Sequence, residues 1–330
     1  MTRFARERTV FVVEPAVTSD QAWLRVTPCT ETGVQAVTLG LPDPGNADEQ
    51  RHAMDLLMAR VGPASAWYCC CEAIGFSDHI PWLSIVYDRL GPNELHSEAH
   101  LMRAADLVVA SSPELSAYGP EIHLLPNGVD QGHFARARDL IPEPADQLHI
   151  PRPLIGYLGP VDGRLDTALI ARLASLRPHW HFVFLGPIHM PEAELPLAPN
   201  LHFLGPKAYR RLPAYLCHWD AAFLPLRADA PAQEETRAWD MLAAGRRIVA
   251  APAPGLVEAF GRISAVSFAQ DAEGFVQGLD AAMSMTDVSD FVAIDDLLDG
   301  MGWDTVYGRA AALMRKVERA SAYAGARLSA

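Results

Sequence analysis

Glycines stand directly after apolar segments at three points in the second half of the chain: Gly159, Gly186 and Gly205. A glycine that ends a strand lets the backbone turn sharply, and it leaves room for a ligand at the carboxyl edge of a sheet. In the first half, Asp88 ends the apolar segment LSIVYD, so we expect it to point toward the same kind of edge. These residues predict a ligand site at strand ends.

The sequence motifs of several enzyme classes are absent. No G-x-G-x-x-G follows a predicted strand and there is no G-x-x-x-x-G-K-[ST], which disfavours dinucleotide dehydrogenases and P-loop NTPases. No G-x-S-x-G marks a hydrolase, no H-E-x-x-H marks a zinc enzyme, and the 12 histidines show no ligand spacing. We therefore expect neither a metal nor a bound cofactor.

Three of the five cysteines are consecutive, at Cys69, Cys70 and Cys71. An odd count with this spacing is not a disulfide framework. Neighbours on a strand point to opposite faces, so the triplet cannot form a tetrahedral metal site by itself. We interpret AWYCCCEAIG as a buried strand in which cysteine serves as a small apolar residue, and reduced cysteines fit a cytoplasmic protein.

Short apolar segments alternate with helical patterns in both halves, which predicts parallel sheets covered on both faces. Strands are expected at 9–14, 34–39, 66–71, 83–88 and 106–110, and then at 154–158, 181–185, 201–204, 220–226 and 247–250. Helices are expected at 94–105, 165–176, 209–216, 236–244 and 305–328. The fold class is therefore α/β with two successive domains.

A proline-rich stretch without periodicity, ARARDLIPEPADQLHIPRP at 135–153, separates the two patterns. It predicts a first domain at 1–140, a linker at 141–153, a second domain at 154–300 and a C-terminal helical segment at 301–330. Open α/β sheets bind ligands at strand-end edges, so two such domains predict a cleft between their edges.

Composition excludes broad classes of partner. The chain of 330 residues carries a formal net charge of −13, which argues against an extended nucleic-acid or anionic-lipid surface. No apolar run reaches the length of a transmembrane helix, and the start MTRFARERTVFVVEP lacks the apolar region of a signal peptide. We expect a cytoplasmic location.

Five segments resemble glycosyltransferase family 4, in the order in which that family carries them. LLPNGVDQGHF at 124–134 resembles its PNGVD…F element, and the stretch 87–115 resembles its E…L…ADLV…S…L segment. The stretches 154–187, 200–226 and 240–252 resemble the opening of its second domain, its N-H-LG…LP-YL…D block and its EYLAAG-PVV-TP block.

This resemblance implies the GT-B fold, with two Rossmann-like domains whose parallel sheets face a central cleft. It also implies transfer of a sugar from a nucleotide-diphosphate donor to the hydroxyl of a sugar or glycolipid acceptor in polysaccharide or glycoconjugate synthesis, with retention of configuration. In the family the pyrophosphate lies at helix N-termini and on basic side chains, where unpaired N–H groups and cations neutralise it. No metal is implied.

Donor-side residues follow from matching the family motifs. Arg164, in GPVDGRLD, stands where the family has a phosphate-contacting basic residue, and Gly159 and Gly186 are implied to line the donor site. Arg237 stands at the position of the phosphate-binding lysine, and Asp240 at that of the ribose-binding glutamate. We therefore assign the donor site to these five residues, with Arg237 also acting in catalysis.

The chain departs from the family in the loop that normally faces the transferred sugar. Ala232 replaces the first glutamate of an E-x7-E pair, Glu234 and Glu235 are out of register, and Trp239 replaces a proline. Two alternatives therefore stay open: a nucleotide-sugar-binding protein with impaired catalysis, and a nucleotide-sugar epimerase.

On the acceptor side the candidates are Glu14, Asp88 and His96, and Asp88 is our choice of catalytic group. The C-terminal helix is expected to pack on the first domain, as the last helix of the family does.

Overall fold

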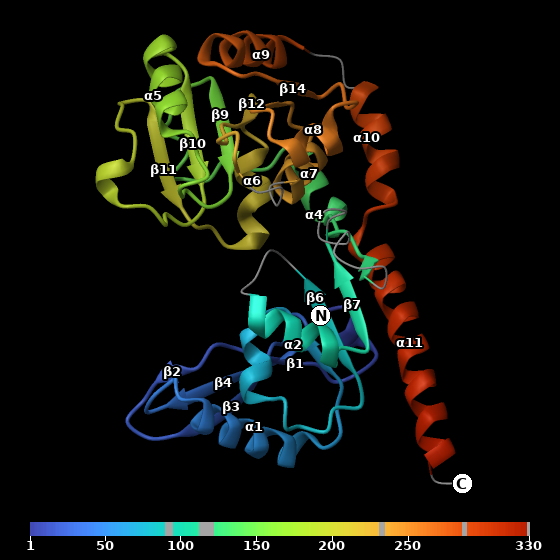
Figure 1. Cartoon of the computed structure of the whole chain (residues 1–330). Helices are drawn as coiled ribbons and strands as arrows, with labels where there is room; N and C mark the ends of the chain where they lie inside the picture. The colour runs from blue at the N-terminus through green and yellow to red at the C-terminus, as the bar shows by residue number, and fades with distance from the viewer. Residues whose placement is uncertain (90–94, 112–121, 231–234, 286–288, 329–330) are drawn as a thin grey trace. The chain divides into compact units, whose positions relative to one another are not determined.

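The computed structural model describes residues 1–89, 95–111, 122–230, 235–285 and 289–328 (Figure 1). The chain divides into two compact units. Unit 1 comprises Met1–Asn127 and the segment from Trp303 onward, and unit 2 comprises Gly128–Gly302. The chain therefore passes from unit 1 into unit 2 between Asn127 and Gly128. It returns to unit 1 between Gly302 and Trp303. Next to that point, the backbone N–H of Val129 donates to the carbonyl of Met301 over 3.0 Å.

Unit 2 is built on a parallel sheet with the strand order β11-β10-β9-β12-β13-β14 in the described part of the chain. Its strands are β9 (Leu154–Leu158), β10 (His181–Leu185), β11 (Leu201–Gly205), β12 (Ala221–Leu224), β13 (Ile248–Ala250) and β14 (Val266–Phe268). The sequence predictions for β9 and β10 are confirmed to the residue. Most residues of β9, β10, β12 and β13 are buried, as expected of strands covered on both faces.

Helices cover both faces of this sheet. They are α4 (Gln131–Phe134), α5 (Thr167–Leu176), α6 (Leu212–Leu216), α7 (Glu235–Ala243), α8 (Pro254–Phe260), α9 (Ala272–Ser284) and α10 (Ser289–Asp299). Figure 1 shows α5 beside α9, while α7 packs with α4, α8 and α10. The chain leaves β9 toward β10 and leaves β12 toward β13, in opposite directions across the sheet. The carboxyl ends of β9 and β12 therefore flank a topological switch point, where sheets of this kind bind ligands.

The proline-rich segment predicted as a linker at 141–153 lies inside unit 2. Asp146 accepts a hydrogen bond of 2.8 Å from the Tyr215 hydroxyl and forms an ion pair of 2.7 Å with Lys207. Gln147 is fully buried, donates to the carbonyl of Tyr215 and accepts from the Trp219 indole over 3.2 Å. Side-chain contacts of this kind hold an aperiodic segment in place, and local periodicity does not reveal them.

Unit 1 contains two sheets in its described residues, where the sequence predicted a continuous parallel pattern. The first consists of β1 (Phe11–Val13), β2 (Val17–Thr18), β3 (Trp23–Pro28) and β4 (Gln35–Leu41). β1 and β2 are parallel to β4, but β3 is antiparallel to it. The helix α1 (Ala47–Val61) packs its Ala53, Met54 and Leu57 against the apolar face of this sheet. The prediction of a parallel sheet covered on both faces is wrong here, since β3 forms a hairpin with β4 and shows half-buried residues alternating with exposed ones.

The second sheet of unit 1 is parallel, in the order β5 (Ala66–Tyr68), β6 (Ile85–Arg89), β7 (Leu107–Ala110) and β8 (Ile122–Leu124). The helix α2 (Leu95–Ala104) connects β6 to β7. β5 ends at Tyr68, and the chain then turns into a short 3-10 helix at Glu72–Phe76. Cys69 and Cys70 are consequently exposed and only Cys71 is buried, so the predicted buried strand through all three is wrong.

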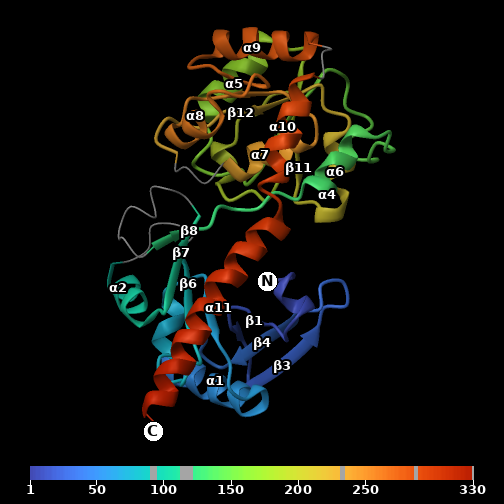
Figure 2. The same ribbon diagram turned by 90° about the vertical axis from the view of Figure 1, so that its right-hand side faces the viewer.

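The long helix α11 (Trp303–Leu328) belongs to unit 1 (Figure 2). Its residues Val306, Ala310 and Met314 pack in one apolar cluster with Phe4 and Val86. Among the described residues, no helix is both long and apolar enough to cross a membrane.

Candidate functional site

Two of the predicted glycines meet at the carboxyl edge of the unit 2 sheet. Gly159 follows β9 and Gly186 follows β10, and a Cβ atom added to Gly186 would lie 1.9 Å from the carbonyl oxygen of Gly159. The backbone N–H of Gly159 donates to the carbonyl of Leu185 over 3.0 Å. Packing of backbone against backbone therefore requires glycine at 186, whether or not a ligand is bound.

Arg164 lies in the loop that joins β9 to α5, at the topological switch point. Its guanidinium forms a bidentate ion pair with Asp162, with an Nη2–Oδ2 distance of 2.7 Å and an Nε–Oδ1 distance of 2.9 Å. The hydrogen bonds from Arg164 hold the pKa of Asp162 below its ordinary value. The predicted phosphate-binding cation is thus already neutralised by a carboxylate two residues away.

The loop after β9 is joined to the loop after β12. The N–H of Arg227 donates to the carbonyl of Arg164 over 2.8 Å, and Leu165 and Leu226 form an antiparallel bridge. At the start of α5, Asp166 caps the helix by accepting from the N–H of Leu169 over 2.9 Å. An anion at this helix end would therefore meet a carboxylate as well as N–H groups.

Arg237 and Asp240 lie one turn apart on α7, the helix that follows β12. Their Nη1 and Oδ2 atoms are 3.6 Å apart, with 41% of the arginine side chain exposed and 7% of the aspartate side chain. Burial raises the pKa of Asp240 to about 7, although the neighbouring Arg237 lowers it. The site thus pairs a half-exposed cation with a buried carboxyl group that titrates near neutral pH.

Asp130 is a second acid near Asp240, and the sequence did not single it out. Its negative charge contributes to raising the pKa of Asp240. It caps α4, accepting from the N–H of His133 over 3.3 Å, and it accepts from the Tyr209 hydroxyl over 3.2 Å. Its one sequence signal is its place in LLPNGVDQGHF, the segment that resembles the PNGVD…F element.

Trp239 is a core residue of unit 2. Its side chain is buried, and its ring centroid lies 4.6 Å from that of Phe260 on α8. The indole thus packs between α7 and α8. Ala232 and Glu234 lie outside the described residues, as does the side chain of Glu235.

Asp88 is in unit 1, within β6 and one residue before its end. It accepts a hydrogen bond of 3.1 Å from the Trp67 indole on β5, and burial raises its pKa. Glu14, another acceptor-side candidate, is exposed and accepts a hydrogen bond of 3.0 Å from the Thr38 hydroxyl. The side chain of His96 lies outside the described residues.

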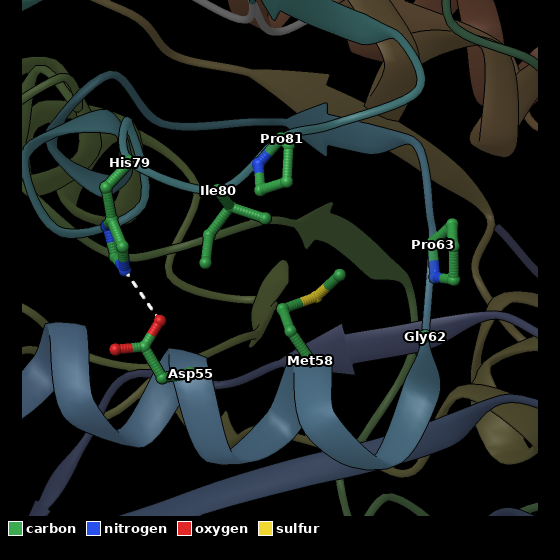
Figure 3. Close-up of a pocket in the computed structure, with 7 residues that line it drawn as sticks. All are labelled: Asp55, Met58, Gly62, Pro63, His79, Ile80 and Pro81. Atoms are coloured by element: carbon green, nitrogen blue, oxygen red, sulfur yellow. Dashed lines mark hydrogen bonds and ion pairs between the residues drawn. The ribbon is translucent and has the colours of Figure 1, made fainter.

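A surface pocket of about 290 Å³ lies elsewhere in unit 1 (Figure 3). Met58, Ile80 and Pro81 line it, and at one end His79 and Asp55 form an ion pair with an Nε2–Oδ1 distance of 2.9 Å. Its lining residues come from α1 and from the loops that precede β5 and β6. None of the sequence-predicted site residues lines it.

The described residues contain no group of three or more His, Cys, Asp or Glu side chains that could hold a metal ion. Of the residues predicted for the donor site, Gly159, Gly186 and Arg164 lie in the loops that follow β9 and β10, and Arg237 and Asp240 lie on α7, the helix that follows β12. The arrangement offers a hydrogen-bond acceptor, a half-exposed cation and close access to backbone.

Comparison with known proteins agrees with this architecture. Sucrose-phosphate synthase from Thermosynechococcus elongatus superposes with a TM-score of 0.72 over 97% of this chain and 91% of its own, at 16% identity. HepE from Anabaena, in complex with UDP and glucose, superposes with a TM-score of 0.65 over 86% of this chain and 87% of its own, also at 16% identity. The chain has the GT-B fold. The fold predicted from the sequence is confirmed.

One curated protein is similar in sequence. It is TuaH of Bacillus subtilis strain 168, provisionally named a teichuronic acid biosynthesis glycosyltransferase, with 24% identity over 243 residues. The match spans 62% of this chain and 61% of that protein, so it covers less than two thirds of the relative. No model of a known protein family matches the sequence.

Proposed function

We propose that this GT-B protein is a glycosyltransferase that moves a sugar from a nucleoside-diphosphate donor to a hydroxyl of a sugar-containing acceptor. The observation that carries the proposal is the pair on α7, where a buried carboxyl group and a half-exposed guanidinium lie one turn apart on the helix that follows β12. The complex of HepE with UDP and glucose supports the same chemistry.

Each residue of the pair has a distinct role in this proposal. Ionised Asp240 accepts hydrogen bonds from two ribose hydroxyls, which replace the water lost on burial. Arg237 binds the pyrophosphate. As the acceptor oxygen bonds to the anomeric carbon, the bond to the pyrophosphate oxygen breaks, negative charge grows on that oxygen, and the departing diphosphate takes up the proton of the acceptor hydroxyl. A fixed guanidinium stabilises that charge more in the transition state than in the ground state.

The remaining expectations belong to the same proposal: retention of configuration, an acceptor bound by unit 1 near Asp88, a role in polysaccharide synthesis and a cytoplasmic location. The glycines at 159 and 186 let the donor approach the main chain. No step in this scheme uses a metal, because Arg237 supplies the positive charge.

Nucleotide binding without catalysis is the second candidate, and the Arg164–Asp162 pair favours it. With Arg164 neutralised, less positive charge is available to stabilise the leaving group. Under this alternative the chain would bind nucleoside diphosphates but release no sugar from any nucleotide sugar.

Titration of the full chain with UDP, GDP and ADP tests the donor site. Charge-assisted hydrogen bonds contribute about 1.5–3 kcal/mol, so Arg237→Ala should weaken binding by about tenfold to a hundredfold. Arg172→Ala is the matched control, because that arginine is exposed on α5 and pairs with Glu273 instead. If none of the three nucleotides binds the wild type at about 1 mM, the proposal is wrong.

A further inference from the structure

Asp130 stands at the start of unit 2 and caps the short helix α4. Its Oδ1 atom accepts from the backbone N–H of His133 over 3.3 Å, and its Oδ2 atom accepts from the Tyr209 hydroxyl over 3.2 Å. Both oxygens thus accept from neutral donors, which leave the negative charge of the carboxylate uncancelled.

Tyr209 is held against α4 by contacts to its ring and to its main chain. The rings of His133 and Tyr209 stack with their centroids 4.2 Å apart and their planes at 13°. The Nε2 atom of His133 donates to the carbonyl of Tyr209 over 3.0 Å. Phe134, which is fully buried, packs edge-on against the Tyr209 ring at 5.8 Å. These contacts fix the hydroxyl that binds Asp130, and so they fix the position of its carboxylate.

The helix α4 packs against α7, the helix that carries Arg237 and Asp240 (Figure 1). Besides burial, the negative charge of Asp130 raises the pKa of Asp240. Only 7% of the Asp240 side chain is exposed, so little water screens the repulsion between the two carboxylates. Arg237 offsets this repulsion from 3.6 Å, but a phosphate bound to its guanidinium would compete for the same positive charge.

Other charged groups near α7 do not take the place of Asp130. The acids of α8 and α10, helices that also pack against α7, are paired with an arginine or exposed: Glu258, Asp290, Asp295, Asp296 and Asp299. The strand β13 carries no charged residue. Burial lowers the pKa of His133 on α4, which is therefore neutral at pH 7. Among the described residues, Arg237 and Asp130 are thus the charges that act on Asp240.

We propose that Asp130 is a positioning residue of the donor site: its negative charge acts on Asp240 and weakens the binding of a nucleoside diphosphate. The proposal rests on the proposed glycosyltransferase function, in which ionised Asp240 binds ribose and Arg237 binds pyrophosphate. Once a phosphate engages Arg237, ionised Asp240 faces Asp130 with less compensation. The nucleoside diphosphate product therefore leaves more readily, and product release limits turnover in many enzymes.

Calorimetric titration of the full chain tests this role, with whichever of UDP, GDP and ADP binds the wild type most tightly. Asparagine also caps helices and its amide oxygen accepts hydrogen bonds, so Asp130→Asn removes the charge and little else. The variant should bind the nucleotide about threefold more tightly than the wild type at pH 6. The gain should shrink toward pH 8, where Asp240 is ionised in both proteins. Asp299→Asn, which removes an exposed charge from α10, should leave the affinity unchanged.

A double variant shows whether Asp130 acts through Asp240. In the Asp240→Asn background, Asp130→Asn should give little of this gain, because the carboxylate on which it acts is gone. Asp130→Ser, a second uncharged helix cap, should reproduce the gain and replaces Asp130→Asn if that variant does not fold. Without nucleotide, a carbon-13 NMR titration of the Asp240 carboxyl group should have a lower midpoint in Asp130→Asn than in the wild type.

The outcomes separate this role from the proposed function. Absence of nucleotide binding by the wild type would refute the proposed function, whereas an unchanged NMR midpoint in Asp130→Asn would refute the role of Asp130 alone. Affinity that stays the same or falls in both uncharged variants also overturns the role, since structural damage weakens binding. A gain of equal size in the Asp240→Asn background would show that Asp130 does not act through Asp240.

Discussion

Replacing Asp240 by asparagine should stabilise the protein, and the gain should grow with pH. Asp240 is 7% exposed and its Arg237 partner lies 3.6 Å away, so the ionised carboxylate is poorly compensated. Asparagine has nearly the same shape and carries no charge at any pH. The substitution therefore removes the cost of ionisation while changing little else in the packing.

The magnitude follows from the difference in pKa between the folded and unfolded chains. Burial moves the pKa of Asp240 from 3.8 to about 7, a difference of about 3 units, and each unit corresponds to about 1.36 kcal/mol. Between these two pH values the folded state binds more protons than the unfolded state, so wild-type stability falls as pH rises. Asp240→Asn should match the wild type near pH 4 and exceed it by about 4 kcal/mol above pH 7.

Urea unfolding of both proteins from pH 4 to pH 8.5 measures this difference, in the absence of nucleotide. Asp162→Asn is a control of opposite sign. The hydrogen bonds from Arg164 depress the pKa of Asp162, so its ionised form stabilises the fold and the variant should lose stability above pH 4. An Asp240→Asn variant that is no more stable than the wild type at pH 8 would show that the carboxylate is well solvated or paired, against our reasoning.

Two further predictions concern residues assigned to the donor site in unit 2. Because ribose hydroxyls bind the ionised form of Asp240, affinity for the bound nucleotide should rise several-fold more from pH 6 to pH 8 in the wild type than in Asp240→Asn, whose profile reports only the ionisation of the nucleotide's terminal phosphate. Calorimetry measures both profiles, and equal pH profiles would contradict the assignment. Gly186→Ala should lower the free energy of unfolding in urea by about 2–4 kcal/mol, because its Cβ would lie 1.9 Å from the carbonyl oxygen of Gly159. Gly163→Ala, with open space around it, should leave the free energy of unfolding unchanged. A Gly186→Ala variant as stable as the wild type would disprove the close packing of the loops after β9 and β10.

Much of unit 2 was predictable from the sequence because its strands are buried on both faces. An uninterrupted apolar run such as LIGYL or HFVFL followed by glycine has few alternatives to a central parallel strand. The order of motifs then pointed to the GT-B fold. Among the parts that were not predicted are β14 and the helices α8, α9 and α10. Another is the segment at 141–153, which has no periodicity yet is anchored through Asp146 and Gln147 to partners more than 60 residues away.

The architecture of unit 1 was less predictable, because its first sheet has one covered face. In β3, WLRVTP at 23–28, half-buried residues alternate with exposed ones through the first four positions. An alternation this short is hard to recognise in a sequence between the apolar strands predicted on either side. The buried strand predicted through Cys69, Cys70 and Cys71 was wrong for a related reason. Cysteine is common in buried strands, but the backbone leaves the sheet after Tyr68, and only tertiary contacts determine where a strand ends.

The donor site shows what motif matching can and cannot reveal. Matching assigned Arg164, Arg237 and Asp240 to one donor site, but it could not predict that Asp162 would neutralise Arg164. Of the two arginines, Arg237 is the more exposed and has the longer ion pair, so it remains the better candidate for a phosphate ligand. Its partner Asp240 is buried at a cost that folding alone does not explain. A ligand that hydrogen-bonds to the ionised carboxylate would offset that cost, which is why the stability of Asp240→Asn and the pH dependence of nucleotide binding test the same physical claim from two sides.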